Sequence, residues 1–269
     1  MKFIPLRHFV PLALKRLILS FNFRAYSNFE SASAASTGYE YPLLLNSLFS
    51  DHIDHKLNSD DSYPLEALRS LISLAGCACS GTITVLDFGG GLGRAYNLSR
   101  KFLPSDIVVK WIVVETEPLV ARAIKEGIAT PELIFVTSIA NALCHAKRFD
   151  VVYSDAALQY TRDPMAILTE LLNLDFSRFM LTRFPVNTDS DQEYFGVQYS
   201  SLSSNGQNAR YAKASMFTKR ISYPFTILPK SKIEQVMQHR HQILLKTQED
   251  LYAYPMSVGW FNNYGYIIK

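Results

Sequence analysis

Residues 85–93 of the chain read Val-Leu-Asp-Phe-Gly-Gly-Gly-Leu-Gly, and this stretch decides the fold. The three residues before it, 82–84, read Thr-Ile-Thr. Residues 82–86 thus have the β-branched and apolar composition of a buried strand. Residues 94–100 then favour a helix. A strand, a glycine-rich turn and a helix N-terminus in this order form a cradle for a nucleotide or a similar ligand.

The spacing of the glycines distinguishes between two kinds of ligand. A dinucleotide loop of the form G-x-G-x-x-G that starts at Gly89 requires a glycine at position 94, where the chain has Arg94. The pattern D-x-G-x-G-x-G fits without a gap, from Asp87 to Gly93. The spacing therefore disfavours a nicotinamide-dependent oxidoreductase.

A second carboxylate follows the next predicted strand. Residues 108–114 are β-branched and apolar and end at Glu115, which leaves room after Asp87 for one helix and one strand of a βαβ unit. Glu117 precedes Pro118 and fits the start of a helix better. We therefore interpret Glu115 as a ligand-binding carboxylate at the tip of the strand, although taken alone it is equally compatible with a solvated loop charge.

Strand and helix patterns alternate through most of the chain, which is typical of a parallel sheet with helices on both faces. The predicted strands are residues 82–86, 108–114, 133–137, 149–153, 179–182, 243–245 and 260–268. The sequence thus predicts a doubly wound, mostly parallel, seven-stranded α/β sheet of the Rossmann-like kind. Residues 1–75 are expected to form a helical N-terminal extension, and residues 76–269 the ligand-binding domain.

Residues 186–222 interrupt this alternation with a polar stretch rich in Ser, Asn, Gln and Tyr. A loop of this length inside a compact domain is usually either functional or disordered. It leaves the carboxyl end of the fifth predicted strand, where open α/β sheets bind their ligands. The sequence therefore predicts a lid over the site, with a disordered segment as the alternative.

The composition excludes several classes of protein. A chain of 269 residues with 48% hydrophobic and 19% charged residues can bury a full core, so it is globular. Its net charge of +3 is too small to indicate nucleic-acid binding. The three cysteines, Cys77, Cys79 and Cys144, fit neither a disulfide framework nor the usual zinc spacing. We expect reduced thiols, no metal and a cytoplasmic location.

Residues 1–22 contain four basic residues and no acidic one. Lys15 and Arg16 interrupt the apolar run, so the segment matches neither the core of a signal peptide nor a transmembrane helix. It is compatible with a basic amphipathic helix on the inner surface of a membrane. The alternative is a helix that packs against its own domain or mediates a dimer.

The glycine loop and Glu115 together resemble the cofactor motifs of class I S-adenosylmethionine-dependent methyltransferases. More narrowly, the chain resembles a bacterial family of methyltransferases that is often associated with surface-polysaccharide genes. The stretches that carry this resemblance are residues 34–39, 86–93, 111–115, 158–160 with 163–164, 222–224 and 265–266. It implies O-methylation of a sugar, a glycan precursor or another small molecule; the alternative is a catalytically inactive, methyltransferase-like binding protein of a glycan pathway.

The resemblance also implies S-adenosylmethionine as the cofactor and a set of residues that bind it. In the glycine loop these are Asp87, Phe88, Gly89, Gly90, Gly91 and Gly93. Beyond the loop, Glu115 is expected to bind the ribose and Ser138 the edge of the adenine.

Four further residues are candidates for contact with the substrate. Asp155, at the end of the fourth predicted strand, is the candidate general base, with a loop-capping carboxylate as the alternative. Gln159, Tyr160 and Tyr223 are candidate substrate contacts. Asp163 precedes Pro164 and is expected to cap a helix instead.

Overall fold

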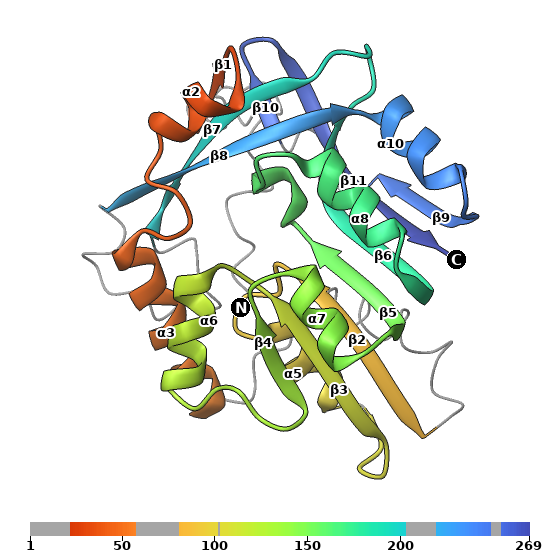
Figure 1. The fold of residues 1–269 in the computed structure, drawn as a ribbon. Helices are drawn as coiled ribbons and strands as arrows, with labels where there is room; N and C mark the ends of the chain where they lie inside the picture. The colour runs from red at the N-terminus through yellow and green to blue at the C-terminus, as the bar shows by residue number, and fades with distance from the viewer. Residues whose placement is uncertain (1–21, 58–80, 102, 203–218, 249–253) are drawn as a thin grey trace, which may run out of the picture.

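The computed structural model describes residues 22–57, 81–101, 103–202, 219–248 and 254–269 (Figure 1). In chain order its helices and strands are β1 (Phe23–Tyr26), α2 (Phe29–Ala34), α3 (Pro42–Leu57), β2 (Thr82–Phe88), α5 (Arg94–Arg100), β3 (Val108–Val114), α6 (Glu117–Lys125), β4 (Leu133–Val136), α7 (Ile139–His145), β5 (Arg148–Asp155), the 3-10 helix η3 (Leu158–Tyr160), α8 (Pro164–Leu172), β6 (Asp175–Asn187), β7 (Tyr194–Ser201), β8 (Arg220–Pro229), α10 (Lys230–Gln238), β9 (Ile243–Gln248), β10 (Tyr254–Met256) and β11 (Gly259–Ile268).

The predicted strands form a doubly wound sheet in the order β4-β3-β2-β5-β6-β11-β9. The first five strands in this order, from β4 through β3, β2 and β5 to β6, run parallel to one another. Strand β11 lies between β6 and β9 and is antiparallel to both. The last two predicted strands, residues 243–245 and 260–268, correspond to β9 and β11, which pair antiparallel. The count of seven strands is wrong, because within the described ranges β1, β7, β8 and β10 extend the sheet to eleven.

Both faces of the central sheet are buried, as the apolar composition of its strands requires. Alternate residues of β3 show this: Trp111 and Val113 face a core with α3 and α6, whereas Ile112 and Val114 face a core with α7, α8 and α10. Figure 1 shows helices on both sides of the strands.

The start of α8 is as predicted, since the Asp163 side chain accepts a hydrogen bond from the backbone N–H of Ala166 at 2.9 Å.

Strand β6 connects the central sheet to a smaller antiparallel one. It pairs with β5 as far as Thr182 and then continues to Asn187, where its last two residues pair with β8. Strand β8 pairs with β7, and β7 with β1. This small sheet, β1-β7-β8, therefore lies beyond the carboxyl end of β5, across the top of Figure 1.

The small sheet corrects two expectations. Residues 186–222 are not a single irregular lid, because residues 194–201 and 220–222 belong to strands β7 and β8; residues 203–218 lie outside the described part of the chain. The N-terminal extension is not purely helical, because it contributes β1 to the edge of the same sheet. In both cases pairing within the small sheet decides the structure of a weakly patterned segment. Strand β7 pairs with β8, which is buried along almost its whole length, and β1 pairs with β7.

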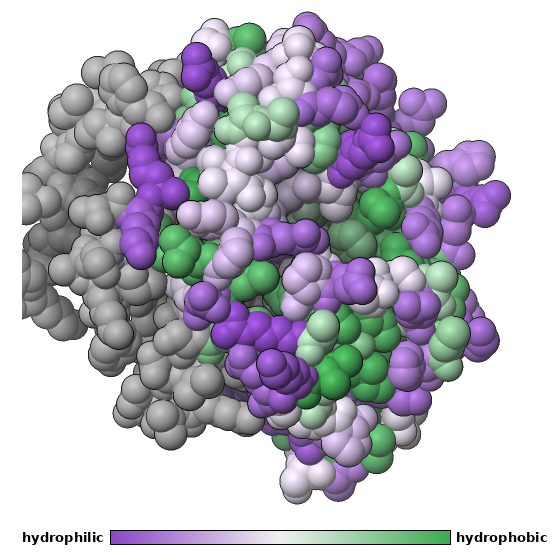
Figure 2. Space-filling model, turned by 60° about the vertical axis from the view of Figure 1, so that its left-hand side comes forward, coloured by the Kyte–Doolittle hydropathy of each residue, from purple (hydrophilic) through white to green (hydrophobic). Residues whose placement is uncertain are grey.

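No helix within the described ranges is long and apolar enough to cross a membrane. Figure 2 shows hydrophilic side chains distributed among apolar ones over one face of the molecule. Residues 1–21, on which the expectation of a membrane-surface helix rests, lie outside the described residues, as do Cys77 and Cys79. These expectations stay predictions.

Candidate functional site

The glycine loop leaves the carboxyl end of β2 and leads into a helix, in the order that the sequence predicts. Gly89, Gly91 and Gly93 have φ values of 71°, 59° and 75°, in the left-handed region that favours glycine. The Gly89 N–H donates to the carbonyl of Val114 at 2.9 Å, which fixes the start of the loop to β3. Helix α5 then begins directly after Gly93.

The loop glycines differ in what a side chain would contact at each position. A Cβ atom on Gly89 would overlap Ala157, one on Gly90 would overlap the carboxylate of Asp87, and one on Gly93 would lie 2.8 Å from Leu133. A Cβ atom on Gly91 would meet no atom within 4 Å. Gly91 is therefore the loop glycine at which a ligand can approach the backbone.

Asp87 lies beneath the loop rather than at its surface. Its side chain is 1% exposed and accepts a hydrogen bond from the indole N–H of Trp111 at 2.9 Å. Burial raises the pKa of the Asp87 carboxyl to about 7, and the negative charges of Asp155 and Glu115 add to this shift, whereas the Trp111 hydrogen bond opposes it. This placement suits a residue that orients the glycine loop, and direct contact of Asp87 with the cofactor stays a prediction.

Glu115 links the end of β3 to the glycine loop. One carboxylate oxygen accepts the backbone N–H of Gly91 and the other that of Thr116, each at 3.0 Å. Burial raises the pKa of Glu115, and these two hydrogen bonds oppose the shift. Each oxygen keeps a further lone pair, so the same carboxylate that fixes Gly91 can accept hydrogen bonds from a diol.

Replacing Glu115 by alanine is expected to weaken binding of S-adenosylhomocysteine by roughly 1–3 kcal/mol, because hydrogen bonds to a charged group are lost. Glu115→Gln keeps one acceptor oxygen and should lose less. Titration calorimetry gives both dissociation constants. Glu117→Ala, at the exposed first turn of α6, is the control and should bind normally. If Glu115→Ala binds S-adenosylhomocysteine with an unchanged dissociation constant and Glu117→Ala binds it more weakly, Glu117 and not Glu115 is the ligand-binding carboxylate.

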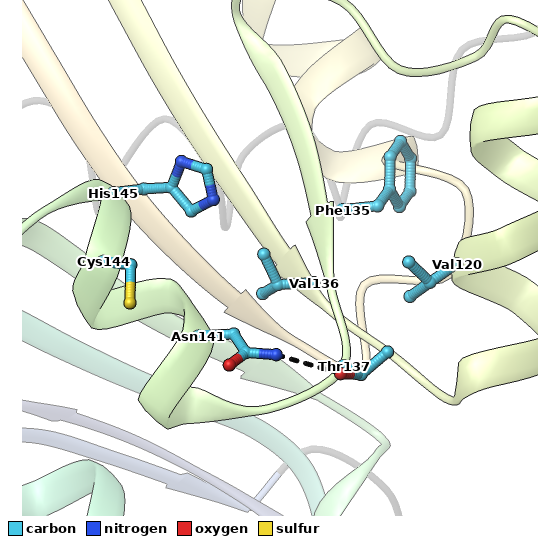
Figure 3. A pocket seen from close by; sticks show the side chains of 7 residues that line it. All are labelled: Val120, Phe135, Val136, Thr137, Asn141, Cys144 and His145. Atoms are coloured by element: carbon cyan, nitrogen blue, oxygen red, sulfur yellow. Dashed lines mark hydrogen bonds between the residues drawn. The ribbon is translucent and has the colours of Figure 1, made fainter.

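Ser138 caps helix α7, since its hydroxyl accepts the backbone N–H of Asn141 at 3.1 Å. A hollow of about 340 Å³ lies beside it, at the outer edge of β4 (Figure 3). Its lining side chains come from α6, β4 and α7 and the turn between the last two. None of them belongs to the glycine loop, and the contact between Ser138 and adenine stays a prediction.

Asp155 is held in an ion pair at the carboxyl end of β5. Its two oxygens accept hydrogen bonds from Nε and a terminal nitrogen of Arg183 at 2.8 and 2.7 Å, and the hydroxyl of Thr182 donates to it at 2.6 Å. A carboxylate stabilised in its charged form by a guanidinium is a weaker proton acceptor. The general-base assignment stays a prediction, and this pairing counts against it.

The backbone on both sides of this ion pair has an unusual conformation. Ala156 and Arg183 have φ values of 53° and 51°, and within the described ranges they are the non-glycine residues with positive φ. Arg183 lies where the pairing of β6 with β11 shifts register, opposite Gly265. Such a bulge bends a strand and redirects its side chains, and here it directs β6 toward the small sheet.

Replacing Arg183 by glycine and by alanine separates backbone strain from the ion pair. Both variants lose the guanidinium, but only glycine adopts φ near 51° without a steric cost. Arg183→Gly is therefore expected to be about 0.5–1 kcal/mol more stable than Arg183→Ala in urea unfolding. Equal stability, or a more stable alanine variant, would mean that position 183 is unstrained.

The remaining candidates lie at different depths. Phe88 is half-buried and packs against the core of the central sheet. Gln159 and Tyr223 are 0% and 1% exposed, so contact of either side chain with a substrate requires the atoms above it to move. Tyr160 is partly exposed and packs against Tyr223. The substrate contacts therefore stay predictions, and Tyr160 is the best placed of the three.

Sequence reasoning missed Trp111 and Arg183. A tryptophan inside a predicted buried strand was a usable signal, because a buried indole N–H requires an acceptor and Asp87 lies on the neighbouring strand β2. Arg183 gave no such signal, since the bulge that positions it depends on pairing with β11. Among the described residues, no group of His, Cys, Asp and Glu side chains has the arrangement of a metal site.

No family model matches the chain, and no curated protein matches its sequence. Solved structures with a similar fold include a S-adenosylmethionine-dependent methyltransferase from Clostridium acetobutylicum, at 14% identity over 82% of this chain and 97% of that one, with a TM-score of 0.45. Magnesium protoporphyrin IX methyltransferase from Synechocystis, with bound S-adenosylhomocysteine, has 12% identity over 76% and 82% of the two chains and a TM-score of 0.44.

The cyclase SpnF is a third similar structure, with 12% identity over 79% of this chain and 84% of its own and a TM-score of 0.47. Several of the similar structures contain S-adenosylmethionine or its demethylated product. At these low identities and TM-scores the similarity concerns the fold and assigns no reaction to this chain.

Proposed function

We propose that this protein is a S-adenosylmethionine-dependent methyltransferase that methylates a hydroxyl group of a small molecule, of the sugar or glycan-precursor class. The observation that carries the proposal is the cradle at the end of β2. There, Gly91 alone among the loop glycines with positive φ has an open Cβ direction, and Glu115 holds its N–H.

The residues present fit the proposed cofactor. The open backbone at Gly91 admits a ligand, and the carboxylate of Glu115 suits the two ribose hydroxyls. When bound, S-adenosylmethionine supplies a methyl group on a positively charged sulfur, so that transfer to a hydroxyl leaves a neutral thioether and releases the hydroxyl proton. The buried Asp87 supports the loop from below through its contact with Gly90.

The chain's own contribution to such a transfer is mainly positioning. Asp155 and Arg183 form a fixed pair at the carboxyl end of β5, next to Ala156 and Ala157, and Ala157 packs on Gly89. The pair can therefore hold an acceptor hydroxyl by hydrogen bonds while Asp155 stays paired with Arg183. Transfer of the hydroxyl proton to solvent completes the reaction.

The alternative proposal is a methyltransferase-like protein that binds a partner without catalysis. The intact loop counts against it, because a protein that binds no cofactor has no physical need for an open backbone at Gly91 beside a carboxylate. A nicotinamide-dependent oxidoreductase is disfavoured by Arg94, which begins α5 where the dinucleotide loop requires glycine.

Titration calorimetry with S-adenosylmethionine, S-adenosylhomocysteine and NAD tests the proposal. We expect saturable binding of the first two and no response to NAD. Binding of NAD without binding of either of the other ligands would overturn it. Transfer of a labelled methyl group to an acceptor, measured by mass spectrometry, then separates a methyltransferase from an inactive binding protein.

A further inference from the structure

Three tyrosines from separate segments form a cluster beyond the carboxyl end of β5. The ring of Tyr39 stacks on that of Tyr223, with centroids 4.1 Å apart and planes 21° apart. Tyr160 meets both rings edge-on, at 4.9 Å from Tyr39 and 6.0 Å from Tyr223. Tyr223 is buried beneath the other two, whereas Tyr39 remains 37% exposed. We call these three residues the tyrosine cluster.

The tyrosine cluster adjoins the cradle through one short stretch of chain. Residues 155–160 run from the ion-paired Asp155 to Tyr160, and Ala157 in their middle packs directly on Gly89. Gln159 in the same stretch donates from its amide to the carbonyl of Arg183 at 3.4 Å. A molecule on the tyrosine cluster therefore lies beside the loop where the cofactor is proposed to bind.

The exposed ring of Tyr39 is held in place by its own backbone. The Thr37 hydroxyl donates to the carbonyl of Ser222 at 3.0 Å and accepts the N–H of Ser222 at 2.9 Å. The N–H of Thr37 donates to the Ser222 hydroxyl, and that of Gly38 to the Ser222 carbonyl, both at 3.0 Å. This clamp anchors the segment before Tyr39 to β8, and the Tyr39 ring then stacks on Tyr223 of the same strand.

An oriented amide completes the polar side of the cluster. The Tyr160 hydroxyl donates to the side-chain oxygen of Gln198 at 2.9 Å, which leaves the NH2 group of Gln198 as a donor. That NH2 group makes no hydrogen bond to another described residue. Three separate parts of the chain supply this surface. Tyr39 lies between α2 and α3, Tyr160 ends η3, and Gln198 belongs to β7 of the small sheet.

We propose that Tyr39, Tyr160 and Gln198 bind the acceptor of the methyltransferase proposed above, and that this acceptor is a saccharide ring. The hydrogen-bearing face of a sugar carries partial positive charge and packs on the negative face of an aromatic ring. Its hydroxyls match the amide donor of Gln198 and the phenol groups of the tyrosines. Rigid tyrosines with an adjacent amide therefore provide both the apolar and the polar contacts of such a ring.

Saturation-transfer NMR with a panel of methyl glycosides of hexoses and 6-deoxyhexoses tests this inference, with and without S-adenosylhomocysteine. We expect at least one methyl glycoside to bind the wild-type chain. Tyr39→Ala should weaken its binding at least tenfold and Gln198→Ala several-fold, whereas Tyr39→Phe, which keeps the ring, should stay within about threefold of the wild type. The dissociation constant of S-adenosylhomocysteine should change in none of them.

Tyr199→Ala is the matched control, because Tyr199 neighbours Gln198 on β7 and adjacent strand residues point to opposite faces. It should leave glycoside binding unchanged. The inference is overturned if no methyl glycoside binds, or if Tyr39→Ala, folded by its melting temperature, binds like the wild type. Failure of S-adenosylhomocysteine to bind overturns the proposed function instead, and the glycoside titration without it reports on the cluster separately.

Discussion

Gly91→Val is expected to abolish detectable cofactor binding while the protein remains folded. The valine side chain would extend into the space where a Cβ atom meets no protein atom within 4 Å, which is the space that the proposed cofactor requires. A β-branched residue also disfavours a φ of 59°. We expect a loss of at least a hundredfold in the affinity for S-adenosylhomocysteine, about 2.7 kcal/mol or more, measured by calorimetry.

Gly127→Val separates the steric effect at the loop from backbone strain. Gly127 follows helix α6 with a φ of 69°, and a Cβ atom there also meets nothing within 4 Å. This variant therefore carries a comparable conformational cost at the opposite end of α6 from Glu115. It should lose stability as Gly91→Val does and bind the cofactor normally. Equal loss of affinity in both variants would mean that destabilisation, and not occupation of the site, causes the effect.

The central sheet could be predicted from the sequence because its strands carry their own signals. Buried parallel strands such as β3 are continuous apolar runs, and the glycine loop fixes where β2 ends. The small sheet could not be predicted in this way. Strand β7 is mixed in composition and β1 has only four residues. Their structure depends on pairing between segments far apart in the chain, of β7 with β8 and of β1 with β7.

The candidate site shows the same division. Asp87, Glu115 and the glycines lie together because one βαβ unit places them at the same edge of the sheet, and spacing along the chain reports that unit directly. The ion pair of Asp155 with Arg183 depends on a bulge in β6. The stacking of Tyr39 on Tyr223 joins residues far apart in the chain through the small sheet. Neither contact leaves a pattern in the local sequence.

Asp87→Asn is expected to stabilise the protein, and to do so increasingly as the pH rises. The pKa of Asp87 is raised from 3.8 to about 7 in the folded chain, chiefly by burial. Between about pH 4 and pH 7 the folded state therefore holds a proton that the unfolded state releases, so wild-type stability falls through this window and the full cost is present above pH 7. A pKa shift of this size lowers the free energy of unfolding by about 4 kcal/mol when Asp87 is charged.

Asparagine is uncharged throughout this range and keeps an oxygen that can accept the Trp111 N–H, so the variant avoids the cost of a buried charge. Urea unfolding at pH 4, 5, 6, 7 and 8 should show a small gain for the variant at pH 4, about 1.5 kcal/mol at pH 5, and up to about 4 kcal/mol at pH 8. Asp163→Asn makes the same chemical change at the exposed cap of α8, where asparagine also caps well, and should show no such trend.

A gain for Asp87→Asn that does not vary with pH would contradict the assignment of the cost to the Asp87 charge. Calorimetry on the same variant then shows why the chain keeps an acid here. If S-adenosylhomocysteine binds more weakly to the more stable variant, the carboxylate under Gly90 is retained for the cofactor at the expense of stability, as is common for buried charges at binding sites. Unchanged affinity in a stabilised variant would limit Asp87 to a structural role beneath the loop.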